Sequence, residues 1–304
     1  LQNENIDAVI LSEGFDFYID RILKSHNLQH LKRITNKSSF ANGILQPQFP
    51  HFGLGCGRCS SCKGYHISKL TGPITSAVFI GDGHSDQHAS EAADLVLAKS
   101  HLGEYLKENG RHHFDFSDFY DVIEILAKII SRNIFTASDR IDFCRQSSRH
   151  HRQLQSLWES GRVMTHVGYP DGLSWSQAKY DDHWRRIAQD EKNIYIALED
   201  KSGTFMGEAK LSSPDDDGFC GHDLKLSPQF WKKGLGREAW TVILDRASMR
   251  WPDSIPLVTP SVGNTAAIDL YRTLGFEFNG DEMEWTPEGI SNAVPIRYRR
   301  MIKR

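Results

Sequence analysis

The sequence predicts a chain of two domains: an α/β N-terminal half built on a parallel, doubly wound sheet, and an α+β C-terminal half with a mixed, mostly antiparallel sheet. The 304 residues are enough for two ordinary domains that each bury a core. Strand, loop and helix signals alternate in the first half, whereas short strands follow one another closely in the second. The polar stretch 131–140 lies between them, so we place the domains at residues 1–135 and 139–304.

Apolar runs and helical periodicity define the elements of the first half. Residues 7–11 form an apolar run that ends at Ser12, and residues 74–80 form another that ends in a Gly-Asp-Gly turn; both predict strands. Apolar residues recur every three or four positions over 89–98 and 119–130, which predicts two helices. In such an alternating fold the ligand site lies beyond the strand ends.

The second half has a different pattern. Residues 141–144 predict a strand and 149–160 a helix, and two further strands, 193–199 and 205–211, flank a turn-forming segment at 200–203. Residues 219–226 continue this antiparallel run. The remaining predicted elements are a helix at 238–249, a strand at 256–259 and a helix at 265–274.

Composition and charge restrict the class of protein. Apolar residues make up 39% of the chain and charged residues 25%, the proportions of a soluble globular protein. A net charge of -3 gives no positive field that would attract nucleic acid. No apolar run reaches the ~18–20 residues that span a bilayer, and no signal peptide is visible. We therefore expect a cytoplasmic protein that binds neither nucleic acid nor membrane; its oligomeric state stays open.

The sharpest local signal in the second half is a glycine-rich turn at the start of a helix. A predicted strand ends at Leu226, and Gly234-Leu-Gly236 then opens the helix. Because glycine has no Cβ, the backbone amides can close on a bulky anion, and the helix N-terminus favours a pyrophosphate there. Lys232 and Lys233 add positive charge. An ordinary turn with two glycines is the alternative.

A second segment gives this turn a specific context. Downstream, directly after the predicted strand 256–259, stands a helix that runs from Asn264 through Tyr271 to Gly275 and Phe276. In this order and spacing, the two segments resemble the GNAT superfamily of acyltransferases over residues 139–304. The resemblance implies an acetyl-CoA-dependent N-acetyltransferase, with acetyl-CoA as the cofactor and an unidentified small-molecule or peptide amine as the acceptor. A domain that binds acyl-CoA without turnover is the alternative.

The resemblance also implies roles for individual residues. The pyrophosphate would lie on the backbone of Lys233, Gly234, Leu235, Gly236 and Arg237. The strand edge at Leu224 and Leu226 would pair with the pantetheine amides, and Asn264 would hydrogen-bond the cofactor. Tyr271 would protonate the leaving thiolate; a packed core aromatic is its other interpretation. Trp231 stands where the family most often has Arg or Gln, which removes a side-chain contact to phosphate.

A base must accept a proton from the attacking ammonium, directly or through water. The candidates are Glu208, His222 and Asp223, which lie on predicted strands beside the cleft. His222 has the most suitable intrinsic pKa, although residues of all three kinds are more often structural or solvated than catalytic. The acceptor is expected over residues 163–175, where aromatic side chains and His166 would orient it.

The first half carries a carboxylate pair beyond its second predicted strand. Asp82 and Asp86 are four residues apart and can together hold one hard cation such as Mg²⁺, although an ordinary Asp-Gly turn is the alternative. With Ser12 and Lys63, this set resembles the haloacid-dehalogenase-like phosphatases, in particular the phosphoserine phosphatase and methionine-salvage branch, whose core domain is Rossmann-like. The resemblance implies that Ser12 and Lys63 bind phosphate, that Asp82 ligates Mg²⁺ and that Asp86 supports the site.

This half departs from the family pattern in one respect. No Asp-x-Asp-x-Thr segment, which carries the nucleophile in these phosphatases, precedes Ser12, and the usual helical cap is absent. We therefore expect no phosphatase activity from the sequence as it stands. The domain is either truncated, which the first residue Leu1 favours, or a degenerate scaffold that binds or dimerises. An upstream nucleophile segment would instead make the protein a bifunctional phosphatase and acetyltransferase.

Three of the five cysteines are clustered at Cys56, Cys59 and Cys62. An odd, clustered set suits reduced thiols or a metal better than a disulfide framework. With His51 or His66 as the fourth ligand, the cluster would form a zinc site; free, packed thiols are the alternative. Cys144 and Cys220 are expected to be buried thiols.

Overall fold

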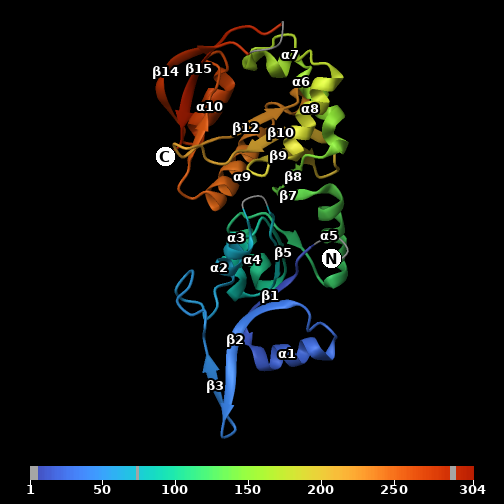
Figure 1. Cartoon of the computed structure of the whole chain (residues 1–304), viewed down its shortest axis with the longest axis vertical. Coiled ribbons are helices and arrows are strands. Elements are labelled where there is room, and N and C mark those ends of the chain that lie inside the picture. The colour runs from blue at the N-terminus through green and yellow to red at the C-terminus, as the bar shows by residue number, and fades with distance from the viewer. Residues whose placement is uncertain (1–5, 73–74, 288–291) are drawn as a thin grey trace. The chain divides into compact units, whose positions relative to one another are not determined.

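The computed structural model describes residues 6–72, 75–287 and 292–304 (Figure 1). By compactness the chain divides into two units, Leu1–Val122 and Ile123–Arg304. This division falls inside helix α5 (Phe119–Arg132), whereas the sequence places the domain boundary in the polar stretch 131–140. Part of that stretch, Ile134–Ala137, forms a buried strand, β7. Leu1 and Ile74 lie outside the described residues.

The first unit begins with a three-stranded sheet in the order β1-β2-β3. β1 and β2 are parallel and are connected through α1, and β2 and β3 form an antiparallel hairpin. The predicted strand 7–11 is present as β1, shifted toward the C-terminus. The elements are β1 (Val9–Phe15), α1 (Asp16–Ser25), β2 (Lys32–Ala41) and β3 (Ile44–Gln48).

A second three-stranded sheet follows, with all strands parallel in the order β4-β5-β6, as the alternating pattern predicts. The helix predicted at 89–98 is wrong in its second half, because α3 ends at Ala92 and residues 95–98 form the fully buried strand β5. Its run Leu-Val-Leu-Ala is apolar on both faces, and periodicity cannot distinguish such a strand from a buried helix. The elements are α2 (Lys63–Leu70), β4 (Val78–Gly81), α3 (Gln87–Ala92), β5 (Leu95–Ala98), α4 (Ser100–Glu108) and β6 (Phe114–Asp115), with a 3₁₀ turn at His84–Asp86.

The second unit contains a five-stranded antiparallel sheet in the order β12-β10-β9-β8-β7. The predicted hairpin is present, because β9 and β10 are adjacent and joined at residues 201–204. Beyond β7, the strands are β8 (Ile141–Arg145), β9 (Ile194–Asp200), β10 (Phe205–Leu211) and β12 (Asp223–Leu226).

A four-stranded sheet in the order β11-β13-β15-β14 completes the unit. β11 (Phe219–Gly221) runs parallel to β13 (Ile255–Val258), so the prediction of one antiparallel strand over 219–226 is wrong for its first half. The chain bends at His222, whose amide donates to the carbonyl of Cys220 at 3.0 Å, and β12 then joins the other sheet. The remaining strands are β14 (Glu277–Trp285) and β15 (Ile296–Ile302).

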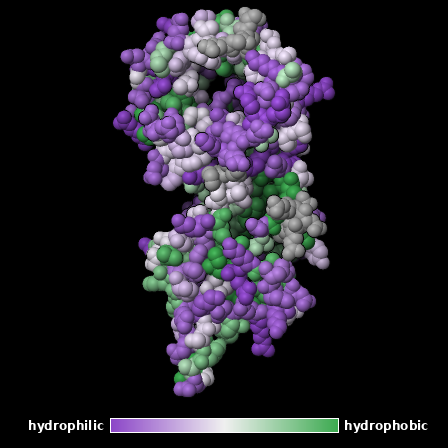
Figure 2. Space-filling model, in the orientation of Figure 1, coloured by the Kyte–Doolittle hydropathy of each residue, from purple (hydrophilic) through white to green (hydrophobic). Residues whose placement is uncertain are grey.

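The helices of the second unit supply part of its core. Trp158, Tyr180 and Trp184 pack together with Leu154 and Leu157 in a cluster formed by the helices between β8 and β9. Hydrophilic side chains predominate on the face of this unit drawn in Figure 2. The helices are α6 (His151–Trp158), α7 (Gly161–Met164), α8 (Gln177–Ala188), α9 (Leu235–Arg250) and α10 (Thr265–Thr273), with 3₁₀ turns at Ser148–His150, Thr165–Val167 and Pro228–Phe230.

None of the described helices has an apolar stretch that could cross a bilayer.

Candidate active site

The bend at His222 opens a wedge between two strands of the second unit. β11 is held parallel against β13, with Gly221 opposite Leu257, and the continuation β12 is held antiparallel against β10. Among the described residues, no strand pairs with the other edge of β12. An edge strand presents unpaired amides and carbonyls to a partner, so the wedge offers backbone hydrogen bonds to a ligand.

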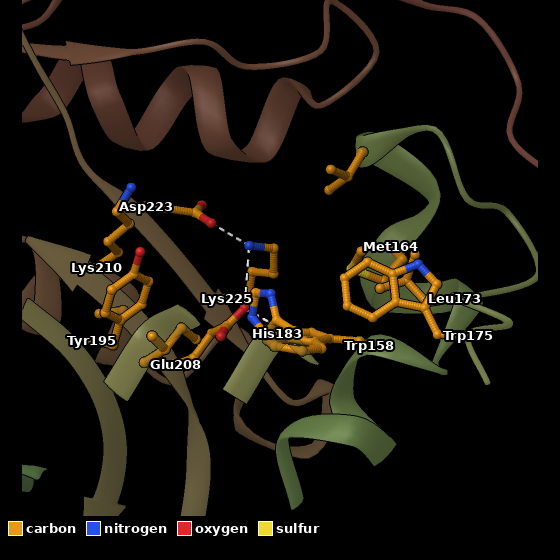
Figure 3. A pocket seen from close by; sticks show the side chains of 13 residues that line it. Trp158, Met164, Leu173, Trp175, His183, Tyr195, Glu208, Lys210, Asp223 and Lys225 are labelled. Carbon is orange, nitrogen blue, oxygen red and sulfur yellow. Dashed lines mark hydrogen bonds and ion pairs between the residues drawn. The ribbon is translucent and has the colours of Figure 1, made fainter. Parts of the chain in front are cut away.

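One face of the β10–β12 pair is charged. Glu208 lies opposite Lys225, and Lys210 lies opposite Asp223. Side chains two residues apart on a strand share a face, so these four project together. The Lys225 ammonium pairs with the carboxylate of Asp223 and lies 3.3 Å from Oε1 of Glu208 (Figure 3).

These charges stabilise one another. Burial alone would lower the pKa of Lys225, but the carboxylates of Asp223 and Glu208 outweigh it and raise that pKa. Burial would likewise raise the pKa of Asp223, and the nearby Lys225 ammonium leaves it lowered instead. The pair is therefore charged at neutral pH.

The charged face forms one wall of a cavity of about 230 Å³. Aromatic and aliphatic side chains form the opposite wall, with Trp158 and Trp175 facing the charged residues (Figure 3). The segment 163–175, expected over the acceptor, contributes four of them; His166 is not among the lining residues, and its pKa is lowered by burial. The lining residues are Trp158, Met164, Val167, Leu173, Trp175, His183, Ile187, Tyr195, Glu208, Ala209, Lys210, Asp223 and Lys225.

The structure separates the three candidate bases. Glu208 and Asp223 line the cavity, and Oε1 of Glu208 accepts a 2.6 Å hydrogen bond from the indole of Trp158. His222 lies behind the wall at the bend, where its Nδ1 accepts from the amide of Ser212 at 3.1 Å. Its Nε2 is buried without a partner among the described residues, and burial, assisted by Lys210, lowers the pKa of His222 to about 4.

Tyr271, on α10, approaches the same charges from another element. Its ring packs edge-on against Trp240, with the centroids 5.3 Å apart, and lies 5.7 Å from Phe276. Burial and the charge of Asp223 raise its pKa well above the usual range, against the opposing effect of Lys225. Tyr271 is not among the residues that line the cavity.

The predicted anion-binding turn lies at the N-terminus of α9. Gly234 is its N-cap residue, with φ +76°, a left-handed conformation that glycine adopts without strain. The first amides of a helix have no partner within it, so the amides that follow Gly234 are available to an anion. Arg140, which the sequence analysis did not identify, braces the turn: it donates to the carbonyl of Lys233 at 2.9 Å and pairs with Glu238 at 2.6 Å.

Several of the residues predicted to contact the cofactor already have partners, among them Leu224, whose amide donates to Oδ1 of Asp223 at 2.9 Å. Oδ1 of Asn264 caps α10 by accepting from the amide of Ala267 at 3.2 Å. The carbonyl of Leu226 accepts a 2.7 Å hydrogen bond from the indole of Trp231. Leu224 and Leu226 occupy the opposite face of β12 from Asp223 and Lys225. Trp231 therefore holds the end of β12, and Asn264 holds the start of α10.

The carboxylate pair of the first unit lies at the end of β4. The ammonium of Lys63 pairs with Asp86 and donates to Oγ of Ser85 at 3.1 Å. The second carboxylate oxygen of Asp86 accepts from the amides of Asp82 and Gly83 at 3.0 and 2.9 Å. Asp86 therefore holds the turn, while its support of a phosphate site and the role of the exposed Asp82 as a ligand of Mg²⁺ stay predictions. Oγ of Ser12 accepts instead from the amide of Gly14 at 3.0 Å.

The clustered cysteines acquire a histidine that the sequence analysis did not select. The donor atoms of Cys56, Cys59, Cys62 and His88 all lie within 4.8 Å of one another. The expected fourth ligands, His51 and His66, are elsewhere: Nε2 of His66 lies 3.0 Å from Oγ of Ser61, and the ring of His51 packs against His66. Cys144 and Cys220 are buried free thiols, as predicted.

The sequence analysis also missed residues that line the cavity, and a sequence signal existed for only some of them. Lys210 and Lys225 alternate with apolar residues on short strands, which marks one shared face. Trp158 and His183 lie on helices far from either motif, and only the fold brings them to the cavity.

Comparison with known proteins supports the family resemblance of each half of the chain. The sequence model of the acetyltransferase (GNAT) family matches residues 154–276. The N-terminal half is similar to 2-hydroxy-3-keto-5-methylthiopentenyl-1-phosphate phosphatases. The similarity to that of Brevibacillus brevis is 31% identity over 134 residues, and to that of Geobacillus kaustophilus 32% over 131 residues. In each case the match covers 42% of this chain and 59% of the relative.

A solved structure is also similar. The crystal structure of spermidine N-acetyltransferase from Vibrio cholerae, in complex with CoA and spermine, matches at a TM-score of 0.46 and 17% identity, over 53% of this chain and 94% of that one.

Proposed function

Residues 154–276 form a GNAT acetyltransferase domain, and from that premise we propose that the second unit transfers an acetyl group from acetyl-CoA to the amine of a small acceptor. The observation that carries the proposal is the free edge of β12, which lies between a glycine-capped helix N-terminus and a cavity lined by aromatic and acidic side chains. The first feature suits a coenzyme and the second an ammonium ion.

The chain holds the cofactor mainly through its backbone. The amides of residues 233–237 bind the diphosphate at the positive end of the α9 dipole, and Lys232 and Lys233 add charge. The free edge of β12, at Leu224 and Leu226, pairs with the pantetheine amides. The bound coenzyme supplies the thioester carbonyl that the amine attacks.

The cavity orients the acceptor and takes its proton. Trp158 and Trp175 exclude water and present ring faces to an ammonium group. Glu208 accepts the proton, because its carboxylate lines the cavity and is fixed by the indole of Trp158 at 2.6 Å. His222 does not line the cavity and takes no part in this step.

Tyr271 delivers a proton to the departing thiolate. The phenol is protonated at neutral pH, as a general acid requires. The charges of Asp223 and Lys225 both act on the pKa of this phenol, so the ion pair that forms part of the cavity wall also lies near Tyr271.

Thiol release from acetyl-CoA, measured against a panel of primary amines and polyamines, tests the proposed activity. We expect release that depends on one class of amine, and a loss of about 100-fold in kcat for Glu208→Gln with unchanged CoA affinity. The matched control is Glu282→Gln, a carboxylate on β14 that pairs with Arg297 and lies outside the cavity. Tight CoA binding without turnover on any amine would instead support an acyl-CoA-binding module.

The first unit supports a second, separate candidate function. Its similarity to phosphatases and the Lys63–Asp86 pair favour phosphate binding beside Asp82. The matched region spans 59% of those relatives, so hydrolysis is a proposal for the whole protein and not for this region alone. Phosphate release from an aryl phosphate, with and without Mg²⁺, tests it; Asp82→Asn should abolish any Mg²⁺-dependent release.

A further inference from the structure

Three thiols and one imidazole converge at one point of the first unit, on the segments that also carry Lys63 and Asp86. The three thiols and Nδ1 or Nε2 of His88 offer donor atoms that all lie within 4.8 Å of one another. Sγ of Cys59 lies 3.6 Å from Nδ1 of His88. In a tetrahedral zinc site, bonds of about 2.3 Å to sulfur and 2.1 Å to nitrogen place these two atom types ~3.6 Å apart. Sγ of Cys59 and Nδ1 of His88 therefore already have the separation that a bound zinc ion requires.

The loop that carries Cys56 and Cys59 turns tightly around the sulfur of Cys56. Sγ of Cys56 accepts from the amides of Arg58 and Cys59 at 3.5 and 3.4 Å. Gly55 and Gly57 on either side both have φ +70°, which bends the chain tightly around Cys56. Backbone amides that point at a sulfur stabilise its thiolate form, and the thiolate is the form that binds metal.

Two glycines allow the cluster to close. A Cβ on Gly55 would lie 3.0 Å from Sγ of Cys62, so the loop passes directly over the third thiol. A Cβ on Gly64 would lie 2.3 Å from the carbonyl oxygen of His88, so the start of α2 packs directly against α3. Cys62, the N-cap residue of α2, is thereby brought beside His88 although they are distant in sequence.

The alternatives explain less of this geometry. A disulfide would join two of the thiols and leave the third and the imidazole unused, and all three cysteines are free. Simple packing of thiols favours full burial, whereas of the three only Cys62 is buried and Cys56 and Cys59 are half-exposed. A ring of four donors at the rim of a fold is the arrangement of a small structural metal site.

We propose that Cys56, Cys59, Cys62 and His88 bind one zinc ion, which pins the loop 55–62 to α3. Three thiolates and an imidazole favour zinc over Mg²⁺ or Ca²⁺. With four protein ligands the site is closed, and its role is structural. Lys63 directly follows Cys62, and Asp86 precedes His88 by two residues, so the metal fixes the two segments that form the Lys63–Asp86 ion pair.

Metal analysis of the full chain tests the proposal. The protein, purified without chelator, should contain one zinc per chain, and cobalt substitution should give the intense visible absorption of a tetrahedral site together with thiolate-to-cobalt charge transfer. His88→Ala should lower zinc affinity by more than the ~10–100-fold that changes next to metal ligands cost. His51→Ala, which removes the histidine that lies against His66, should leave zinc content and the cobalt spectrum unchanged.

A variant that replaces one ligand with another distinguishes the loss of a metal ligand from misfolding. His88→Cys should retain zinc in a four-thiolate site and increase the cobalt charge-transfer band, which a variant that merely unfolds would lose. The proposal is overturned if the folded wild-type chain binds no zinc or cobalt, if the metal follows His51 instead of His88, or if the cysteines form a disulfide under reducing preparation.

Discussion

Tyr271 illustrates how one side chain can be both packed and placed for chemistry. Its ring is held between Trp240 and Phe276, which accounts for the aromatic residue. Packing does not require a hydroxyl, however, and the phenol is close enough to Asp223 and Lys225 for their charges to shift its pKa. The two interpretations therefore differ in what the oxygen atom contributes.

Removing the hydroxyl of Tyr271 distinguishes the packing interpretation from the catalytic one. Tyr271→Phe keeps both ring contacts, so we expect unchanged thermal stability and CoA affinity, with kcat lower by about 100-fold because the thiolate leaves without a proton donor. Steady-state kinetics and calorimetric CoA binding measure the two effects. Tyr298→Phe, on β15, serves as the matched control. Equal losses of affinity and turnover would mean that the residue only packs.

Gly236 tests whether the turn at the start of α9 binds the diphosphate, because the space around it limits which side chains can replace it. A Cβ here would lie 3.4 Å from Leu270 and 3.9 Å from Leu226, which is ordinary contact. Gly236→Ala should therefore bind CoA nearly as the wild type does. Gly236→Val adds two methyl groups against Leu226 and Leu270 and displaces the turn, so we expect at least a tenfold loss of CoA affinity by calorimetry. Equal affinity for the Val and wild-type proteins would contradict the assignment of the turn.

Among the helices and strands, the sequence correctly predicted those whose formation depends on nearby residues. The β9–β10 hairpin follows from its turn residues, and α9 follows from a glycine cap and an apolar face. The buried strand at 95–98 could not be predicted from local signals, because its apolar run has no periodicity of its own. It forms a strand by pairing with β4 and β6. The bend at His222 also depends on distant partners, since β13 holds one side and β10 the other.

The same distinction applies to the sites. Glycines and the Asn264–Tyr271 spacing are local, and they identified the turn and α10. His88 could not be selected over His51 or His66 by proximity in sequence, because the packing of α2 on α3 through Gly64 brings it to the cysteines. The cavity walls formed by Trp158 and His183 are non-local for the same reason.

The junction of β8, β9 and the helices around them contains a buried ionic network. Glu199 is 2% exposed and accepts from Arg132 at 2.7 Å, Arg149 at 2.6 Å and His150 at 3.1 Å. Burial would raise its pKa, but these partners outweigh it and lower the pKa of Glu199 to about 2. A folded-state pKa below the unfolded value means that the stabilisation is fully present above about pH 4.5 and is lost as the pH falls toward 2.

We expect this residue to contribute about 3 kcal/mol of that acid sensitivity. Glu199→Gln should be less stable than the wild type at pH 7, because it leaves buried cations without their counter-charge. Its free energy of unfolding should also fall less steeply between pH 4.5 and pH 2. Urea denaturation at several pH values measures both, with Glu282→Gln as the surface control. Parallel pH profiles for Glu199→Gln and the wild type would show that the network does not set acid stability.

At the scale of the whole molecule, each unit has a core of its own. Val96, Leu102 and Leu106 belong to a cluster in the first unit, and Leu154, Trp158 and Tyr180 to one in the second. The proposed metal lies among residues of the first, and the proposed coenzyme site lies among residues of the second. A ligand stabilises the folding unit that binds it and leaves an independently folding unit unchanged.

We therefore expect two thermal transitions that respond to different ligands. CoA at ~100 times its Kd should stabilise the second unit by about 2.7 kcal/mol, which raises the Tm of a unit of this size by roughly 5–10 °C. A zinc chelator should lower only the other transition, because metal-binding free energy is folding free energy for the segment it closes. Differential scanning calorimetry resolves both, and His88→Ala should reproduce the effect of the chelator without altering the response to CoA. A single transition that both ligands shift would show instead that the two cores unfold together, because linkage to one site would then appear in the stability of the entire chain.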